Sequence, residues 1–133
     1  PMKLVDIHIQ SVPHPQHNLK TIREMIKEAK SQGVEAVFLP EVFYSISDGT
    51  KPTPYLVEDN NEHYKNIQKL ATDYRVYLLG GSAACLVDGK VMNRSFNFDP
   101  SGKEIGRYDK MNLFSCDLSK HPSNQIIDEA RVY

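Results

Sequence analysis

Cysteine is scarce in this sequence, and neither sign of charge is in excess. Two cysteines, Cys85 and Cys116, occur in 133 residues. This is too few for a disulfide framework or a thiolate metal site, so both are expected to be free thiols. The 16 Lys and Arg residues oppose 17 Asp and Glu residues and give a formal net charge of −1. Such a balance provides no basic field of the kind that nucleic-acid binding requires, so we expect no nucleic-acid partner.

Long hydrophobic runs are absent as well. No apolar stretch approaches the roughly 20 residues that a membrane-spanning helix needs. The first segment, PMKLVDIHIQ, has no signal-peptide layout. We therefore expect no membrane partner and a cytoplasmic location. A composition of 40% hydrophobic and 25% charged residues is typical of one soluble globular domain or part of one.

Two common ligand-binding signatures are also missing. The histidines His8, His14 and His17 lack metal-ligand spacing on a regular element, so we expect no zinc site. The turn Gly80-Gly81-Ser82 does not belong to a GxGxxG fingerprint, and Gly89-Lys90 lacks the remaining residues of a P-loop. A nucleotide-binding domain is therefore not supported.

The pattern that is present begins with a strand, a helix and a second strand. Apolar and polar residues alternate from Lys3 to Gln10, which indicates a strand. Asn18 is placed to cap an amphipathic helix that Gly33 would end in a left-handed conformation. A short apolar run from Val34 to Leu39 follows directly. Together these elements predict a βαβ unit with two parallel strands.

A loop, a second helix and an antiparallel meander are predicted next. The segment from Phe43 to Asn60 has no period and reads as a long loop, and loops of this length are usually functional or mobile. Asn60 or Asn61 caps the second helix, and Val76 to Ala84 follows as a buried strand. The meander comprises the turn Asp88-Gly89, a strand from Val91 to Phe98, a turn at 99–102 and a strand from Glu104 to Lys110. The expected class is α/β (α+β).

Two charged residues stand at the ends of predicted strands. Glu41 follows Pro40 at the carboxyl end of the second parallel strand, the edge of an α/β sheet where ligand sites form. Lys110 ends the last strand of the meander. Taken singly, a solvated loop glutamate and a surface lysine are the simpler interpretations, so neither residue indicates a function without the other.

The segments around both residues resemble the signatures of one family. They are VEAVFLPEVF at 34–43 and MNRSFNFDPSGKEIGRYDKMNLF at 92–114. Both are similar to the nitrilase, or carbon-nitrogen hydrolase, superfamily, which hydrolyses nitriles, amides, carbamoyl groups and related bonds. This chain carries the family's Pro-Glu at 40–41, its Asn at 93, its Phe-x-Asp-Pro-x-Gly turn at 98–102 and its Tyr-x-Lys at 108–110.

The resemblance implies the fold and the extent of the domain. The family fold is an αββα four-layer sandwich, in which two sheets face each other with helices outside. The family domain is considerably longer than this chain, and the stretch from Ser119 to Tyr133 has no clear period. Residues 1–133 are therefore expected to be the amino-terminal portion of one domain, the amino-terminal half of the sandwich, without the part that carries the nucleophilic cysteine.

The resemblance also assigns chemical roles. Glu41 would be the general base, Lys110 would stabilise the oxyanion, and a cysteine outside this chain would attack the substrate. A thiol with its usual pKa of about 8.5 is mostly protonated, so a carboxylate must take the proton during attack. A fixed ammonium stabilises the negative charge that develops in the transition state. Glu129, in IDEARVY at 127–133, matches a second glutamate of the family site, and the alternative interpretation is a solvated acidic residue.

Neither cysteine of this chain is expected to be the nucleophile. Cys116 lies in a segment where the family has a loop, ahead of its nucleophile, and Cys85 lies in a largely apolar strand. The expected function is hydrolysis of a small-molecule amide, or less often a nitrile, without metal or organic cofactor, and with no activity in the isolated chain. A homodimer, or pairing with the missing half, is expected. The alternative is a catalytically silent protein that retains the fold as a binding or assembly partner.

Overall fold

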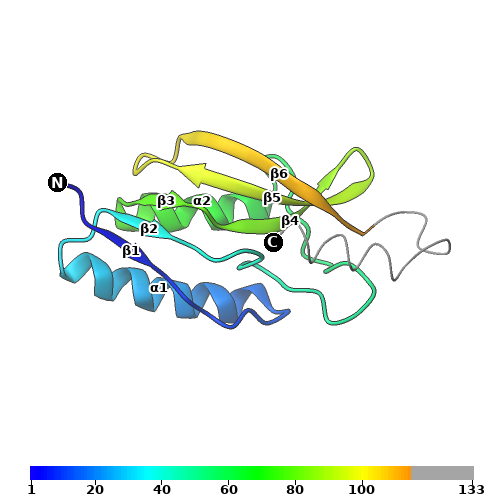
Figure 1. Cartoon of the computed structure of the whole chain (residues 1–133), viewed down its shortest axis with the longest axis horizontal. Helices are drawn as coiled ribbons and strands as arrows, with labels where there is room; N and C mark the ends of the chain where they lie inside the picture. The colour runs from blue at the N-terminus through cyan, green and yellow to red at the C-terminus, as the bar shows by residue number, and fades with distance from the viewer. Residues whose placement is uncertain (115–133) are drawn as a thin grey trace.

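The computed structural model describes the backbone of residues 1–114 and the side chains up to Lys110 (Figure 1). The element order is β1 (Leu4–Asp6), α1 (Pro15–Ser31), β2 (Ala36–Phe38), α2 (Glu62–Tyr74), β3 (Tyr77–Leu79), β4 (Ser82–Val87), β5 (Lys90–Phe98) and β6 (Glu104–Phe114). None of the helices in this part of the chain has the length and apolar character needed to cross a membrane.

The six strands form one mixed sheet. Strands β1, β2 and β3 are parallel neighbours, as two successive βαβ units require. Strands β3 and β4 both pair antiparallel with one edge of β5, and β6 pairs antiparallel with its other edge. The predicted order of two crossovers followed by a meander is confirmed.

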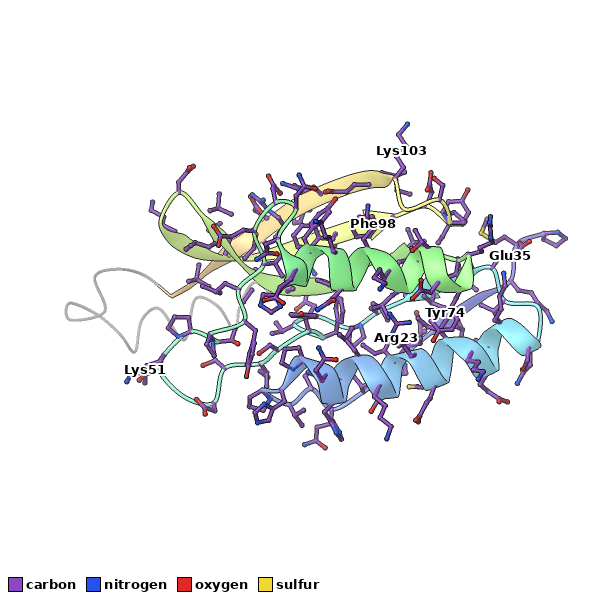
Figure 2. The ribbon with its side chains drawn as sticks, turned by 180° about the vertical axis from the view of Figure 1, so that it is seen from behind. Arg23, Glu35, Lys51, Tyr74, Phe98 and Lys103 are labelled. Atoms are coloured by element: carbon purple, nitrogen blue, oxygen red, sulfur yellow. The ribbon has the colours of Figure 1, made fainter. Side chains whose placement is uncertain are left out.

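Both helices pack on the same face of the sheet. Figure 2, which views the molecule from behind, shows α1 and α2 side by side in front of the strands. Arg23 of α1 forms an ion pair with Asp73 of α2 at 2.9 Å and lies over the ring of Tyr74. The core between helices and sheet is formed by residues from both layers, including Ile22, Ile26, Ile67, Leu70, Val37, Leu78, Phe96 and Phe98. No described helix or strand covers the opposite face, which Figure 1 shows toward the viewer.

The helix starts differ in how well they were predicted. Asn61 caps α2 as expected, since its side chain accepts a hydrogen bond from the amide of Tyr64 at 2.8 Å. The prediction that Asn18 caps α1 was wrong, because the helix begins at Pro15, whose fixed φ suits the first helical turn. Asn18 is 1% exposed, and its amide bonds instead to the backbone of Val12.

The strands also depart from the expected boundaries. The run predicted as one strand from Val76 to Ala84 is divided into β3 and β4 at Gly80 and Gly81. A Cβ at Gly81 would lie 2.6 Å from the Cβ of Leu39, so only glycine permits this approach of the chain after β2. Strand β1 is shorter than predicted, and β6 continues past Lys110.

Candidate active site

Glu41 and Lys110 meet in the structure, although 69 positions separate them in the sequence. The Nζ of Lys110 donates a hydrogen bond to Oε1 of Glu41. The side chain of Lys110 is 21% exposed and that of Glu41 is 37% exposed, so both remain open to solvent. A carboxylate and an ammonium are thus held against each other at an accessible position.

Alternation along β6 places Lys110 on the face of the sheet opposite α1 and α2. Arg107 lies over the core ring of Phe96, on the face that the helices cover. Successive strand residues point to opposite faces, so Tyr108 and Lys110 point away from the helices. The 65% exposure of Tyr108 agrees with this assignment. The ion pair therefore lies on the side of the sheet opposite α1 and α2.

A strained turn positions Glu41. Val42, the next residue, has φ 50, a left-handed value that β-branched residues rarely adopt. Its amide donates to Oγ of Ser82 at 2.9 Å, and the amide of Phe43 donates to the carbonyl oxygen of Ser82 at 3.0 Å. Ser82 is fully buried at the start of β4. Ser82 thus accepts hydrogen bonds from both backbone amides that follow Glu41, and these bonds hold the turn in its unfavourable conformation.

Tyr44 anchors the same segment on its other side. Its carbonyl oxygen accepts a hydrogen bond from the Asn18 side chain at 2.9 Å. Its hydroxyl lies 2.6 Å from Nδ1 of His63 and accepts from the side chain of Asn66 at 3.0 Å. Burial raises the pKa of Tyr44, so its hydroxyl stays protonated and available for both bonds. The segment after Glu41 is fixed by contacts to both helices.

A β-bulge positions Lys110. In the ladder between β5 and β6, Arg94 pairs with Asp109 and Asn93 pairs with Met111, so Lys110 is the additional residue between them. Arg94 binds Asp109 through two parallel hydrogen bonds, Nε to Oδ1 at 2.5 Å and Nη2 to Oδ2 at 2.9 Å. The hydrogen bond from Arg94 holds the pKa of Asp109 below its usual range. The residue before Lys110 is therefore charged and tightly held.

The other candidate residues are not brought to this site by the described structure. Cys85 is 1% exposed within the core, and burial raises the pKa of its thiol to about 11. That environment disfavours the thiolate and supports the prediction that Cys85 acts as a small hydrophobic residue. Glu129 and Cys116 lie outside the described residues. Among the residues described, no group of three His, Cys, Asp or Glu side chains could hold a metal ion.

The residues that support the ion pair between Glu41 and Lys110 were not predicted from the sequence. The importance of Arg94 could have been predicted from the sequence, because Arg94 lies on the same face of its strand as the core residues Phe96 and Phe98. A charged side chain on a buried face needs a partner, and the meander offers Asp109 opposite it. Ser82 carried no comparable signal, since a serine in an apolar strand does not reveal which backbone amides approach it.

Known proteins resemble this chain in sequence and in structure. The carbon-nitrogen hydrolase family model matches residues 5–129. A hydrolase of Schizosaccharomyces pombe is 32% identical over 114 residues, which cover 84% of this chain and 35% of the relative. Omega-amidase NIT2 of Homo sapiens is 31% identical over 118 residues, which cover 88% of this chain and 42% of the relative. An amidase from Nesterenkonia sp. superposes with a TM-score of 0.69 at 20% identity, covering 86% of this chain and 44% of the amidase.

These comparisons bear on fold and family separately. The structural likeness confirms the predicted fold class, an α/β layer of the nitrilase type. The chain spans less than half the length of these curated relatives, 35% and 42%. The match covers 44% of the solved amidase, which is consistent with one half of a four-layer sandwich. The second sheet of that sandwich stays a prediction. The family match, by contrast, extends over nearly all of the sequence. The chain belongs to the carbon-nitrogen hydrolase family.

Proposed function

We propose that this chain is part of an amidase in which Glu41 and Lys110 act with a cysteine located outside this chain. One observation carries the proposal: a carboxylate and an ammonium from distant parts of the sequence are in contact, and both are partly exposed. By the family resemblance, this pair would supply a general base and a stabilising charge for an oxyanion. A strained residue directly after Glu41 is a further feature of functional sites.

The proposed reaction proceeds through an acyl-enzyme. Glu41 takes the thiol proton while the sulfur bonds to the carbonyl carbon, and Lys110 donates a hydrogen bond to the oxygen that becomes negative. The C–N bond then breaks, and the leaving nitrogen takes the proton from Glu41. Water attacks the resulting thioester as Glu41 accepts a proton from it. The carboxylic acid departs, and the proton returns to the sulfur.

An amide is the proposed substrate class. Curated relatives at about a third identity are named omega-amidases, and the solved neighbours include an amidase whose complex with butyramide is known. In another structure of that amidase, acrylamide has added to an active-site cysteine. These names support an amide over a nitrile for this chain, and they support covalent catalysis by a thiol.

Two proposals concern the parts of the site that lie outside residues 1–114. Glu129 is proposed as a second carboxylate of the site because of its family-like surroundings. The isolated chain is proposed to be inactive for two reasons. Cys85 is buried with a thiol pKa of about 11, and Cys116 lies in the sequence ahead of the place where the family carries its nucleophile.

The decisive test measures amide hydrolysis by the whole protein with Glu41→Gln and with Lys110→Ala. We expect either substitution to lower kcat by about 100-fold or more, since each removes a group that acts only in the transition state. Matched controls are Glu35→Gln and Lys103→Ala, which change exposed side chains of the same types. Figure 2 shows both control residues away from the helices' shared core.

The possible outcomes separate the two functions considered. Wild-type turnover in either site variant would overturn the Glu-Lys assignment. A whole protein that binds small amides without turning them over would instead favour the catalytically silent partner. Near-wild-type melting temperatures in all four variants are needed, because they show that a lost rate reflects chemistry and not unfolding.

A further inference from the structure

The β-bulge at Lys110 bends strand β6 at the residue that is proposed to act in the site. Strand β6 shifts register against β5 between Arg94 and Asn93, and Lys110 is the residue that the shift leaves over. Such a bulge bends the strand and redirects a side chain, and bulges are frequent beside active sites. The direction of the Lys110 amine therefore depends on what holds the bulge in place.

The strongest contact at the bulge is the ion pair between Arg94 and Asp109. Its two parallel bonds, at 2.5 and 2.9 Å, fix both the position and the rotation of the Asp109 carboxylate. The Arg94 side chain is only 10% exposed and that of Asp109 is 36% exposed. Because Asp109 directly precedes Lys110, the pair restrains the backbone on one side of the bulge.

Within the described part of the chain, Arg94 and Asp109 bond to each other and not to Glu41, so they are not placed to take part in the chemistry. They lie on the face that the helices cover, whereas Lys110 points to the other face. Any effect on the site must therefore pass through the backbone between positions 109 and 110. Resting on the proposed function of Lys110, we propose that Arg94 and Asp109 are positioning residues that hold the bulge and thereby aim the Lys110 amine at Glu41.

A second ion pair on the same face of β6 offers a matched comparison. Arg107 binds Glu104 at 2.7 Å and Asp59 at 2.8 Å, with its side chain 33% exposed. It ties β6 to the segment before α2, but it does not adjoin the bulge at Lys110. A merely structural role predicts similar consequences for both pairs, whereas a positioning role predicts a loss of rate for only one of them.

The test removes the pair without leaving a buried charge. In the whole protein, Arg94→Met is combined with Asp109→Leu, because a buried ion pair can often be replaced by apolar residues with little loss of stability. We expect a melting temperature close to wild type, a nearly unchanged KM for an amide, and a kcat about 10- to 100-fold lower, since a misplacement of about 1 Å can cost that much. Arg94→Lys alone keeps the positive charge but cannot make the two parallel hydrogen bonds to Asp109. It should give a smaller loss of kcat.

The control and the epistasis measurement make the test decisive. Replacing Arg107 by Met together with Asp59 by Leu should leave kcat within about twofold of wild type, because surface changes away from a site have small effects. In a Lys110→Ala background, removing the Arg94 and Asp109 pair should cause no further loss of kcat, since residues that act as a unit are not additive.

Contrary results would be easy to recognise. A stable variant without the Arg94 and Asp109 pair that keeps wild-type kcat overturns the positioning role, and so does an equal loss of rate in the Arg107 control. If Lys110→Ala itself keeps wild-type kcat, the proposed function fails, and the positioning role fails with it. If Lys110→Ala abolishes turnover while removal of the pair does not, only the positioning role fails.

Discussion

Val42 bears the clearest conformational strain in the described structure. Within residues 1–114, four non-glycine residues have positive φ, namely Val42, Asn60, Arg75 and Asp88. Val42 is the β-branched member of this group, and such residues are genuine outliers in the left-handed region. It directly follows Glu41, so the unfavourable backbone occurs where the carboxylate must turn toward Lys110. The strain at this residue is therefore tied to the candidate site.

Replacing Val42 by glycine should stabilise the protein. Relief of the left-handed strain is worth about 1–3 kcal/mol, and the added freedom of glycine in the unfolded chain offsets about 1 kcal/mol of it. Denaturant unfolding of the whole protein measures the difference. Asp88→Gly is the matched control, because Asp88 also has φ 50 but lies in a hairpin turn that aspartate tolerates. An equal effect at both positions would show that Val42 is not specially strained.

At the scale of elements, the helices could be predicted from the sequence more accurately than the ends of the strands. Both helices followed from their apolar stripes, which are properties of neighbouring residues. The end of β1 could not be read this way, because alternation continues to Ile9 while pairing with β2 extends only to Asp6. The break at Gly81 was hidden as well, since the apolar run continues through it and the cause is the approach of Leu39 and Phe43.

The link between α2 and β6 depends on the protonation of one tyrosine. The hydroxyl of Tyr64 donates to Oε1 of Glu104 at 2.8 Å. Burial, together with the hydrogen bond to Glu104, raises the pKa of Tyr64 to about 12. A raised pKa means that the folded state prefers the neutral phenol. This contribution to stability is fully present below the unfolded pKa of about 10 and is lost as the pH rises toward 12.

Comparison of wild type with Tyr64→Phe tests this link. Near pH 8 the variant should be about 1–3 kcal/mol less stable, because it loses a hydrogen bond to a charged group. The difference should shrink as the pH increases above 10, since ionisation removes the same bond from wild type. Urea unfolding at several pH values provides the measurement. A difference that stays constant up to pH 12 would contradict the raised pKa.

At the scale of the whole molecule, the two outer strands of the sheet, β1 and β6, each expose an apolar side chain. Leu4 of β1 is 57% exposed and Ile105 of β6 is 49% exposed. Both lie on strands of a sheet whose second face has no described helix or strand over it. The chain also spans less than half the length of its curated relatives. We propose that the remaining part of the domain covers this face in the whole protein.

Lysine substitutions can test whether that face is covered. Leu4→Lys and Ile105→Lys should each destabilise the whole protein by about 2 kcal/mol or more, because a buried charge needs a partner. Ile46→Lys, at a residue of 40% exposure in the loop after β2, should change stability by less than about 0.5 kcal/mol. Equal small effects at all three positions would show that the face stays exposed to solvent.

The expected homodimer is a separate prediction, for which sedimentation of the whole protein is the measurement.

The candidate site was predictable in its residues but not in its geometry. Glu41 and Lys110 could be named because their local sequences resemble a family. Their contact could not be derived, because it depends on the order of strands and on the turn at Val42. The need of Arg94 for a charged partner could be read from the sequence, but its place beside the bulge could not, since a bulge exists only once two strands have paired in a defined register.

The contact between Glu41 and Lys110 depends on the strands that lie between them in the sheet. Glu41 follows β2 and Lys110 belongs to β6, and the strands between them are β3 with its continuation β4, and β5. Neighbouring strands are about 4.8 Å apart, so the two side chains reach each other only if every intervening strand is in place. A chain in which one of these strands is unpaired would therefore lack part of the framework that holds the two residues in contact. For this protein, the candidate active site depends on pairing across the whole sheet.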